Sequence, residues 1–164
     1  AYLSDSRWNE AAIATLSLAK KFKKPGILDA EAPVSEQAVD LASHVAFSKQ
    51  GLSHFTNKDD VTASLKVIEN DFNSWACVTD GSNGVYFLEE GTLCNLPAPE
   101  IKAKDTLGAG DVWHGAFAVC LAEGKSEIEA IKFSNLAAAI KCTKFGGQSS
   151  IPTRTEINEF FNSK

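Results

Sequence analysis

The chain has 164 residues, contains no methionine, and carries neither a basic surplus nor a long apolar run. It has 16 Lys and Arg against 21 Asp and Glu, a net charge of −5, and no basic stretch interleaved with aromatic residues, so we expect no nucleic-acid partner. The apolar runs are far too short to cross a bilayer, so we expect no membrane partner either. Because a natural chain begins with methionine, we expect Ala1 to open an N-terminally truncated piece of a longer protein.

Cysteine and histidine are scarce and scattered, which bears on metal sites and on the redox compartment. The three histidines show no pairing with the cysteines, so a zinc site is not expected. None of the cysteines forms a C-x-x-C pair, and each has apolar or strand-like neighbours, which is typical of buried free thiols in a reducing compartment. The first residues also lack the basic start of a secretory signal. We therefore expect a cytoplasmic protein with four free thiols: Cys77, Cys94, Cys120 and Cys142.

Short apolar runs alternate with segments of helical periodicity along the whole chain. With 44% hydrophobic residues and no linker or repeat, residues 1–164 are predicted to form a single domain with its own core. Strands are expected at 2–4, 27–28, 45–47, 75–79, 85–89 and 92–96. Helices are expected at 10–22, 34–41, 58–72 with Asn57 as the N-cap, 112–122, 127–144 and 155–161. The alternation predicts an α/β fold, a mostly parallel sheet flanked by helices on both faces, with one antiparallel hairpin at 85–96.

The most informative segment reads D-T-L-G-A-G-D at 105–111 and stands directly before an apolar helical stretch. A glycine-rich turn that opens a helix directs unpaired N–H groups and the positive end of the helix dipole at one point, which attracts phosphate or an oxyanion. The backbone of Gly108, Ala109 and Gly110 is the candidate anion site. Asp111 is the candidate general base, since a carboxylate beside an anion site suits phosphoryl transfer to a hydroxyl. The alternative is a tight loop in which Asp111 only complements the helix dipole.

Together with Trp113 and G-A-F at 115–117, this segment resembles the C-terminal signature of the PfkB (ribokinase-like) family of carbohydrate kinases. The local pattern is closest to the ketohexokinase and sulfofructose-kinase-like branches. The resemblance implies transfer of the γ-phosphoryl group of ATP to a sugar hydroxyl with Mg²⁺, this chain carrying the nucleotide site and the catalytic base. It also implies a monovalent-cation (K⁺) site near Asp105 and Thr106. For Asp105, capping of the turn is the equal alternative.

The resemblance assigns nucleotide contacts to six residues: Thr79, Gly81, Gly84, Asn135, Gly146 and Gly147. The first three match a T-x-G-x-x-G segment of the family, although the residues alone read as an ordinary Asp-Gly and Asn-Gly turn. The asparagine stands where the family has one near the adenine, and its alternative is a solvent-facing position on a helix. The last two glycines follow that helix, and the alternative for them is a helix C-cap.

Two further points concern the magnesium ligands and the contacts to the sugar. Many family members carry N-x-x-E after the strand at 45–47, which is associated with metal and phosphate binding, whereas this chain has S-K-Q-G at 48–51, so its magnesium ligands are unknown. Arg7 and Asp29 lie at or just after early strand ends, where ligands bind in parallel sheets, and are the substrate candidates. A surface salt bridge is the alternative for Arg7. The sugar itself is not indicated.

Other classes of function remain open at this point. Because the family's sugar-binding half lies largely outside this chain, the alternative is a catalytically silent nucleotide-binding fragment or interaction module. If a homodimer forms, we expect it in the full-length protein. An unrelated flavodoxin-like domain is disfavoured, because no phosphate loop follows the first strand.

Overall fold

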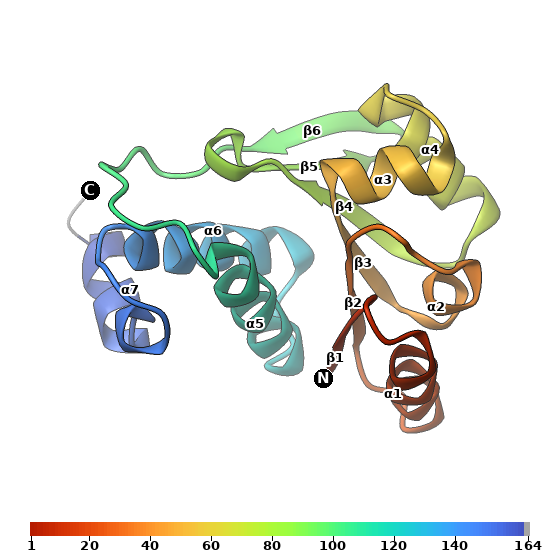
Figure 1. Ribbon diagram of the computed structural model, residues 1–164, viewed down its shortest axis with the longest axis horizontal. Helices are drawn as coiled ribbons and strands as arrows, with labels where there is room; N and C mark the ends of the chain where they lie inside the picture. Colours follow the sequence, from red (N-terminus) through yellow and green to blue (C-terminus); the bar gives the residue numbers. More distant parts are fainter. Residues whose placement is uncertain (163–164) are drawn as a thin grey trace. The chain divides into compact units, whose positions relative to one another are not determined.

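The computed structural model describes residues 1–162, which form two compact units: unit 1, Ala1–Leu96, and unit 2, which begins at Pro97 (Figure 1). Each unit has its own secondary structure. The prediction of one domain over residues 1–164 stays a prediction.

Unit 1 is built on a six-stranded sheet whose strands follow one another in sequence order. The first four strands are parallel to one another, whereas the fifth pairs antiparallel with the fourth and with the sixth. The predicted α/β class, a mostly parallel sheet with an antiparallel hairpin at 85–96, is confirmed. The strands are β1 (Tyr2–Asp5), β2 (Gly26–Ala30), β3 (His44–Ser48), β4 (Trp75–Thr79), β5 (Val85–Glu89) and β6 (Thr92–Leu96).

The helices of unit 1 are α1 (Asn9–Lys21), α2 (Glu36–Leu41), α3 (Lys49–Thr56) and α4 (Val61–Asp71). The expected helix at 58–72 with Asn57 as N-cap is wrong in its start, and α3 was not predicted. Asn57 instead ends α3 with a φ of 56°, and Asp60 begins α4 by accepting from the Ala63 amide at 2.6 Å. Asparagine suits both helix ends because its short polar side chain tolerates the left-handed conformation as well as capping an N-terminus.

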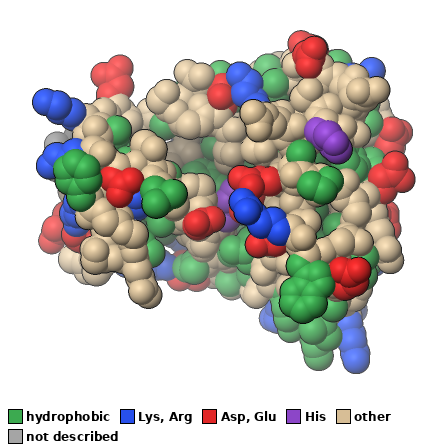
Figure 2. All heavy atoms as spheres, viewed as in Figure 1, with side chains coloured by type: hydrophobic (Ala, Val, Ile, Leu, Met, Phe, Trp, Pro, Cys, Tyr) green, Lys and Arg blue, Asp and Glu red, His purple; other side chains and the backbone are tan. Residues whose placement is uncertain are grey.

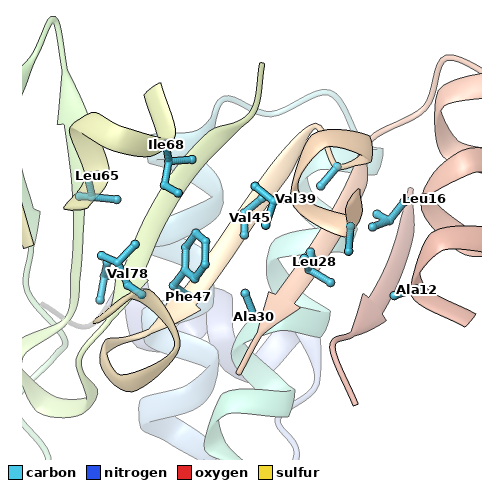
Figure 3. Close-up of a cluster of buried hydrophobic side chains, with 13 residues drawn as sticks. Ala12, Leu16, Leu28, Ala30, Val39, Val45, Phe47, Leu65, Ile68 and Val78 are labelled. Atoms are coloured by element: carbon cyan, nitrogen blue, oxygen red, sulfur yellow. The ribbon is translucent and has the colours of Figure 1, made fainter. Parts of the chain in front are cut away.

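The core of unit 1 lies between the sheet and these helices (Figure 3). Leu28, Val45, Phe47 and Val78 point from neighbouring strands toward apolar side chains of the helices, among them Leu16 of α1, Val39 of α2, and Leu65 and Ile68 of α4. Parallel strands are buried along their length, which is why they read as continuous apolar runs. This packing fixes the strand ends that carry the predicted ligand residues of unit 1.

Unit 2 is helical: α5 (Ala109–Ala122), α6 (Glu127–Cys142) and α7 (Arg154–Asn162). A capping box starts α6, in which the Ser126 hydroxyl faces the Glu129 amide and the Glu129 carboxylate accepts from the Ser126 amide at 3.0 Å. Helix α5 begins three residues earlier than predicted, so Asp111 lies inside its first turn. Within residues 1–162, no helix is both long and apolar enough to span a bilayer.

The four cysteines are all free thiols. Cys77, Cys120 and Cys142 are buried free thiols, as predicted, while Cys94 is half-buried and also free. Burial raises the pKa of the buried thiols and thereby keeps them protonated. On the face drawn in Figure 2, acidic and basic side chains are interspersed.

Candidate active site

The D-T-L-G-A-G-D segment forms a turn that leads directly into α5. Gly108 is the N-cap of the helix with a φ of +75°, a left-handed conformation that favours glycine. The Ala109 amide, predicted as a donor of the anion site, instead donates to the Thr106 carbonyl at 3.1 Å. In the described part of the chain, the amides of Gly108, Gly110 and Asp111 have no acceptor. Three such donors at the positive end of a 14-residue helix are groups that attract anions, and the anion site beside the Asp111 carboxylate stays a prediction.

The start of this loop is hydrogen-bonded to the end of α6. The Lys104 amide donates to the Cys142 carbonyl at 2.8 Å, and the Lys141 ammonium donates to the Asp105 carbonyl at 3.1 Å. The Asp105 carboxylate accepts from the Leu107 amide at 3.0 Å and from the Gly146 amide at 3.1 Å. These two amides, followed by the nearby Lys141 ammonium, lower the pKa of Asp105. Asp105 therefore caps its own turn and also joins that turn to the loop after α6.

Two buried side chains near the start of α5 form hydrogen bonds, one within the helix and one to its surroundings. His114 is buried, and its Nδ1 donates to the Gly110 carbonyl at 2.8 Å, since a carbonyl can only accept. The Trp113 indole donates to the Asn135 amide oxygen at 2.8 Å, and the Asn135 amide nitrogen donates to the Pro97 carbonyl at 3.3 Å. Asn135 is thus 6% exposed rather than solvent-facing on its helix. Its role near an adenine stays a prediction.

A cavity of about 650 Å³ opens beside this loop within unit 2. Gly108 and Asp111 lie at its wall, together with Lys141 and with Gly147 of the loop after α6. The other walls are mostly apolar and include Val112, Ala116, Phe133, Ala137 and Ile157. A cavity with apolar walls and a few polar groups is the usual form of a small-molecule site, so this cavity, with Asp111 at its wall, is the candidate site of unit 2.

The predicted nucleotide loop of unit 1 is a tight turn between β4 and β5. The Asp80 amide donates to the Gly84 carbonyl at 2.8 Å, and Gly81 and Gly84 have φ values of 52° and 86°. The Thr79 hydroxyl donates to the Phe47 carbonyl of the neighbouring strand at 3.3 Å. The turn geometry is therefore as the Asp-Gly and Asn-Gly pattern indicates, and the nucleotide contacts of Thr79, Gly81 and Gly84 stay predictions.

The substrate candidates of unit 1 lie at neighbouring strand ends. Asp29 of β2 stands opposite Asp5 of β1 in the parallel register. Arg7 follows β1 and forms a salt bridge with Glu31 at 2.9 Å, its side chain 77% exposed, which is the surface pair expected as the alternative. Such exposed pairs leave the guanidinium accessible, so a substrate role of Arg7 also stays a prediction. Residues 1–162 hold no cluster of three or more His, Cys, Asp or Glu side chains that could bind a metal ion.

Comparison with known proteins identifies the family. A profile described as pfkB family carbohydrate kinase matches residues 2–154. The chain belongs to the PfkB family of carbohydrate kinases. The ribokinase of Bacillus subtilis (strain 168) is 29% identical over 130 residues, which cover 79% of this chain and 43% of that relative.

Solved ribokinase structures share the fold of this PfkB chain. A ribokinase from Thermotoga maritima is 30% identical with a TM-score of 0.82, over 98% of this chain and 56% of that one. The ribokinase of Arabidopsis thaliana, complexed with ribose and ATP, is 25% identical with a TM-score of 0.85, over 96% of this chain and 54% of that one. The chain thus spans about half the length of these relatives.

One polar residue of the site was missed in the sequence. Lys141 lies near the end of α6, is 1% exposed, and contacts the backbone of Asp105, 36 positions earlier. Its sequence signal was a lysine between Ile140 and Cys142, within an otherwise apolar stretch of helix. Lysine is almost never fully buried without a partner, so this position indicates a specific contact.

Proposed function

We propose that this chain carries the nucleotide site and the catalytic base of an ATP-dependent sugar kinase, which transfers the γ-phosphoryl group of ATP to a sugar hydroxyl. The observation that carries the proposal is the start of α5. There Asp111 stands in the same turn as three amides without an acceptor in the described chain. Membership of the PfkB family supports the reaction class.

The reaction follows from these groups. A sugar hydroxyl is too weakly acidic to ionise at neutral pH, so the Asp111 carboxylate takes its proton as the hydroxyl oxygen bonds to the γ-phosphorus and the bond to the leaving ADP breaks. The amides of Gly108, Gly110 and Asp111 donate to the equatorial phosphoryl oxygens, whose charge they stabilise at the helix N-terminus. Because Gly110 has open space where a Cβ would stand, the phosphoryl group can approach the backbone closely.

The nucleotide is assigned to ATP because the related Arabidopsis ribokinase is described in complex with ribose and ATP. The nucleotide contacts assigned by the family motif are Thr79, Gly81, Gly84, Asn135, Gly146 and Gly147. Mg²⁺ prefers a few carboxylates, water and nucleotide phosphates over an all-protein cage, which suits a chain without a cluster of metal ligands in its described residues. The ion would supply neutralisation of phosphate charge.

The acceptor is a small sugar of unassigned identity, and Arg7 and Asp29 are its candidate contacts. A second function is favoured by the share of the relatives' length that this chain matches. The match covers only 43% of the Bacillus subtilis ribokinase. In that case the chain is a nucleotide-binding module without turnover of its own.

Calorimetry with ATP and Mg²⁺, followed by a coupled kinase assay with ribose, fructose and related sugars, separates the two functions. Binding with turnover supports the kinase, binding without turnover on any sugar supports the module, and absence of ATP binding contradicts both. Asp111→Asn keeps the shape of the side chain and removes the base. We expect it to lower kcat by about 10²–10⁴-fold with little change in the affinity for ATP.

The matched control is Asp71→Asn, an exposed carboxylate at the end of α4, which should leave kcat unchanged. Full turnover in Asp111→Asn would exclude Asp111 as the base. If both variants lose activity equally, the loss reflects general damage to the protein, and the assignment then lacks its support.

A further inference from the structure

Lys141 is the most unusual charged residue of the described chain. Its side chain is 1% exposed, and it projects from α6 between apolar neighbours. Moving an ammonium group out of water is costly unless the group is paired and hydrogen-bonded. Within residues 1–162 its partner is Asp105, whose carbonyl oxygen lies 3.1 Å and a carboxylate oxygen 3.8 Å from Nζ.

The two oxygens that receive this ammonium belong to the residue where the family resemblance implies a monovalent cation. A backbone carbonyl and a carboxylate are the ligands that hard cations prefer in proteins. The Asp105 carboxylate also accepts hydrogen bonds from the Leu107 and Gly146 amides. A free K⁺ bound here would stand close to a buried positive charge and be strongly repelled. The residues present therefore do not fit a bound monovalent cation at Asp105.

We propose that the ammonium group of Lys141 takes the place of a monovalent cation in this chain and holds the 105–111 loop without K⁺. Lys141 is a positioning residue, because it contacts the start of the loop and not the Asp111 end. A cation that is part of the chain needs no binding step, so the loop keeps its shape whatever the salt composition. The consequence for catalysis, turnover independent of K⁺, rests on the proposed kinase function, whereas the consequence for the loop does not.

The test is the thermal melting of the chain in tetramethylammonium chloride, with KCl replacing it in steps at constant ionic strength. A cation site filled at a hundred times its dissociation constant would raise the Tm of a chain of this size by roughly 5–10 °C. We expect the wild-type Tm to change by less than about 1 °C. A saturable rise of several degrees in the wild type would overturn the proposal.

Lys141→Met keeps the length of the side chain and removes its charge. We expect a lower Tm in tetramethylammonium chloride and a recovery of several degrees with KCl, because Asp105 is then left with a vacant cation position. Lys132→Met, an exposed lysine on the same helix, should show neither change. A Lys141→Met protein that melts like the wild type in both salts would refute the role of Lys141.

Lys141→Arg retains the charge and covers the case in which Lys141→Met fails to fold. It should melt independently of K⁺, and a K⁺-dependent Tm in this variant would contradict the proposal. None of these measurements requires ATP or sugar, so they stand even if the kinase function fails. Where turnover is found, kcat in the wild type should be equal in KCl and in tetramethylammonium chloride.

Discussion

The two glycine-rich loops of this chain, 79–84 in unit 1 and 105–111 in unit 2, are held in different ways. The backbone of the first closes through its own residues, since the Asp80 amide donates to the Gly84 carbonyl and the Asn83 amide to the Asp80 carbonyl. Its distant partners contact it mainly through side chains at its rim, such as the Lys49 ammonium on the Asp80 carboxylate at 3.0 Å. The second is held by partners 36 and 41 positions away, the Lys141 ammonium and the Gly146 amide. A short-range turn can be recognised from its own residues, whereas a loop with distant anchors depends on the fold around it.

The interiors of the two units differ in the same sense. Of the six buried polar residues in the described chain, five lie in unit 2, and these are His114, Ser134, Asn135, Lys141 and Ser150. In unit 1 the corresponding space is filled by apolar side chains beneath α1 to α4. Polar groups inside a protein require specific partners, so the loop geometry of unit 2 depends on a few hydrogen bonds, whereas unit 1 depends on apolar packing.

The strongest test of this difference is Phe47→Ala in unit 1. Phe47 is fully buried in the middle of the sheet and packs against Phe55. Removing its ring leaves a cavity, and we expect a loss of about 3–5 kcal/mol in the free energy of unfolding from urea titration. Phe22→Ala is the matched control, since its ring is 54% exposed and its loss should change stability by about 0.5 kcal/mol or less. Equal effects of the two variants would contradict an apolar core as the main support of unit 1.

Gly108→Ala addresses the loop of unit 2. At a φ of +75° an alanine is strained, and we expect a loss of about 1–2 kcal/mol in unfolding free energy. Gly110→Ala lies two residues on, has no positive φ and meets no neighbouring atom, so its stability should stay within about 0.5 kcal/mol of the wild type. Hydrogen exchange of peptides from unit 2 would locate the effect. A Gly108→Ala variant as stable as the wild type would show that the turn accommodates a Cβ at this position.

Ser126→Ala tests the helix that carries Lys141. The substitution removes the capping box of α6, and we expect a loss of about 1 kcal/mol. Ser35→Ala removes the simpler cap of the six-residue α2, where we expect about 0.5 kcal/mol. Denaturation curves of both variants provide the comparison. A larger loss in Ser35→Ala would show that unit 1 depends on its caps more than its apolar core indicates.

The smallest expected effect concerns the thermal stability of unit 2 as the pH is lowered. The Lys144 ammonium at 2.6 Å, together with the Thr153 amide and hydroxyl, lowers the pKa of Glu156 from 4.5 to about 2. Since the folded pKa is depressed, this stabilisation is present above pH 4.5 and is lost as the pH falls toward 2. We expect the wild type to melt about 1–3 °C above Glu156→Gln at pH 6 and the two to converge near pH 2. A constant difference between them would contradict the assigned pKa.

Much of the fold follows from local pattern. The strands at 75–79, 85–89 and 92–96 were predicted at their observed positions, because apolar runs and turn residues act over short distances. The pattern does not predict α3, because its eight residues make only about two helical turns, too few for periodicity to indicate a helix. In the site, Asp111 could be placed from the motif, because a glycine-rich turn before an apolar helix is a short-range signal.

By itself, the sequence determined the alternation of strands and helices, the positions of the glycines that need a left-handed backbone, and the family to which the motif belongs. Only the tertiary structure decided that Asn135 is buried against Trp113 and that Lys141 reaches Asp105. The physical reason is distance along the chain. Backbone preferences and periodicity act between near neighbours, whereas burial and the partner of a buried charge depend on residues that only folding brings together.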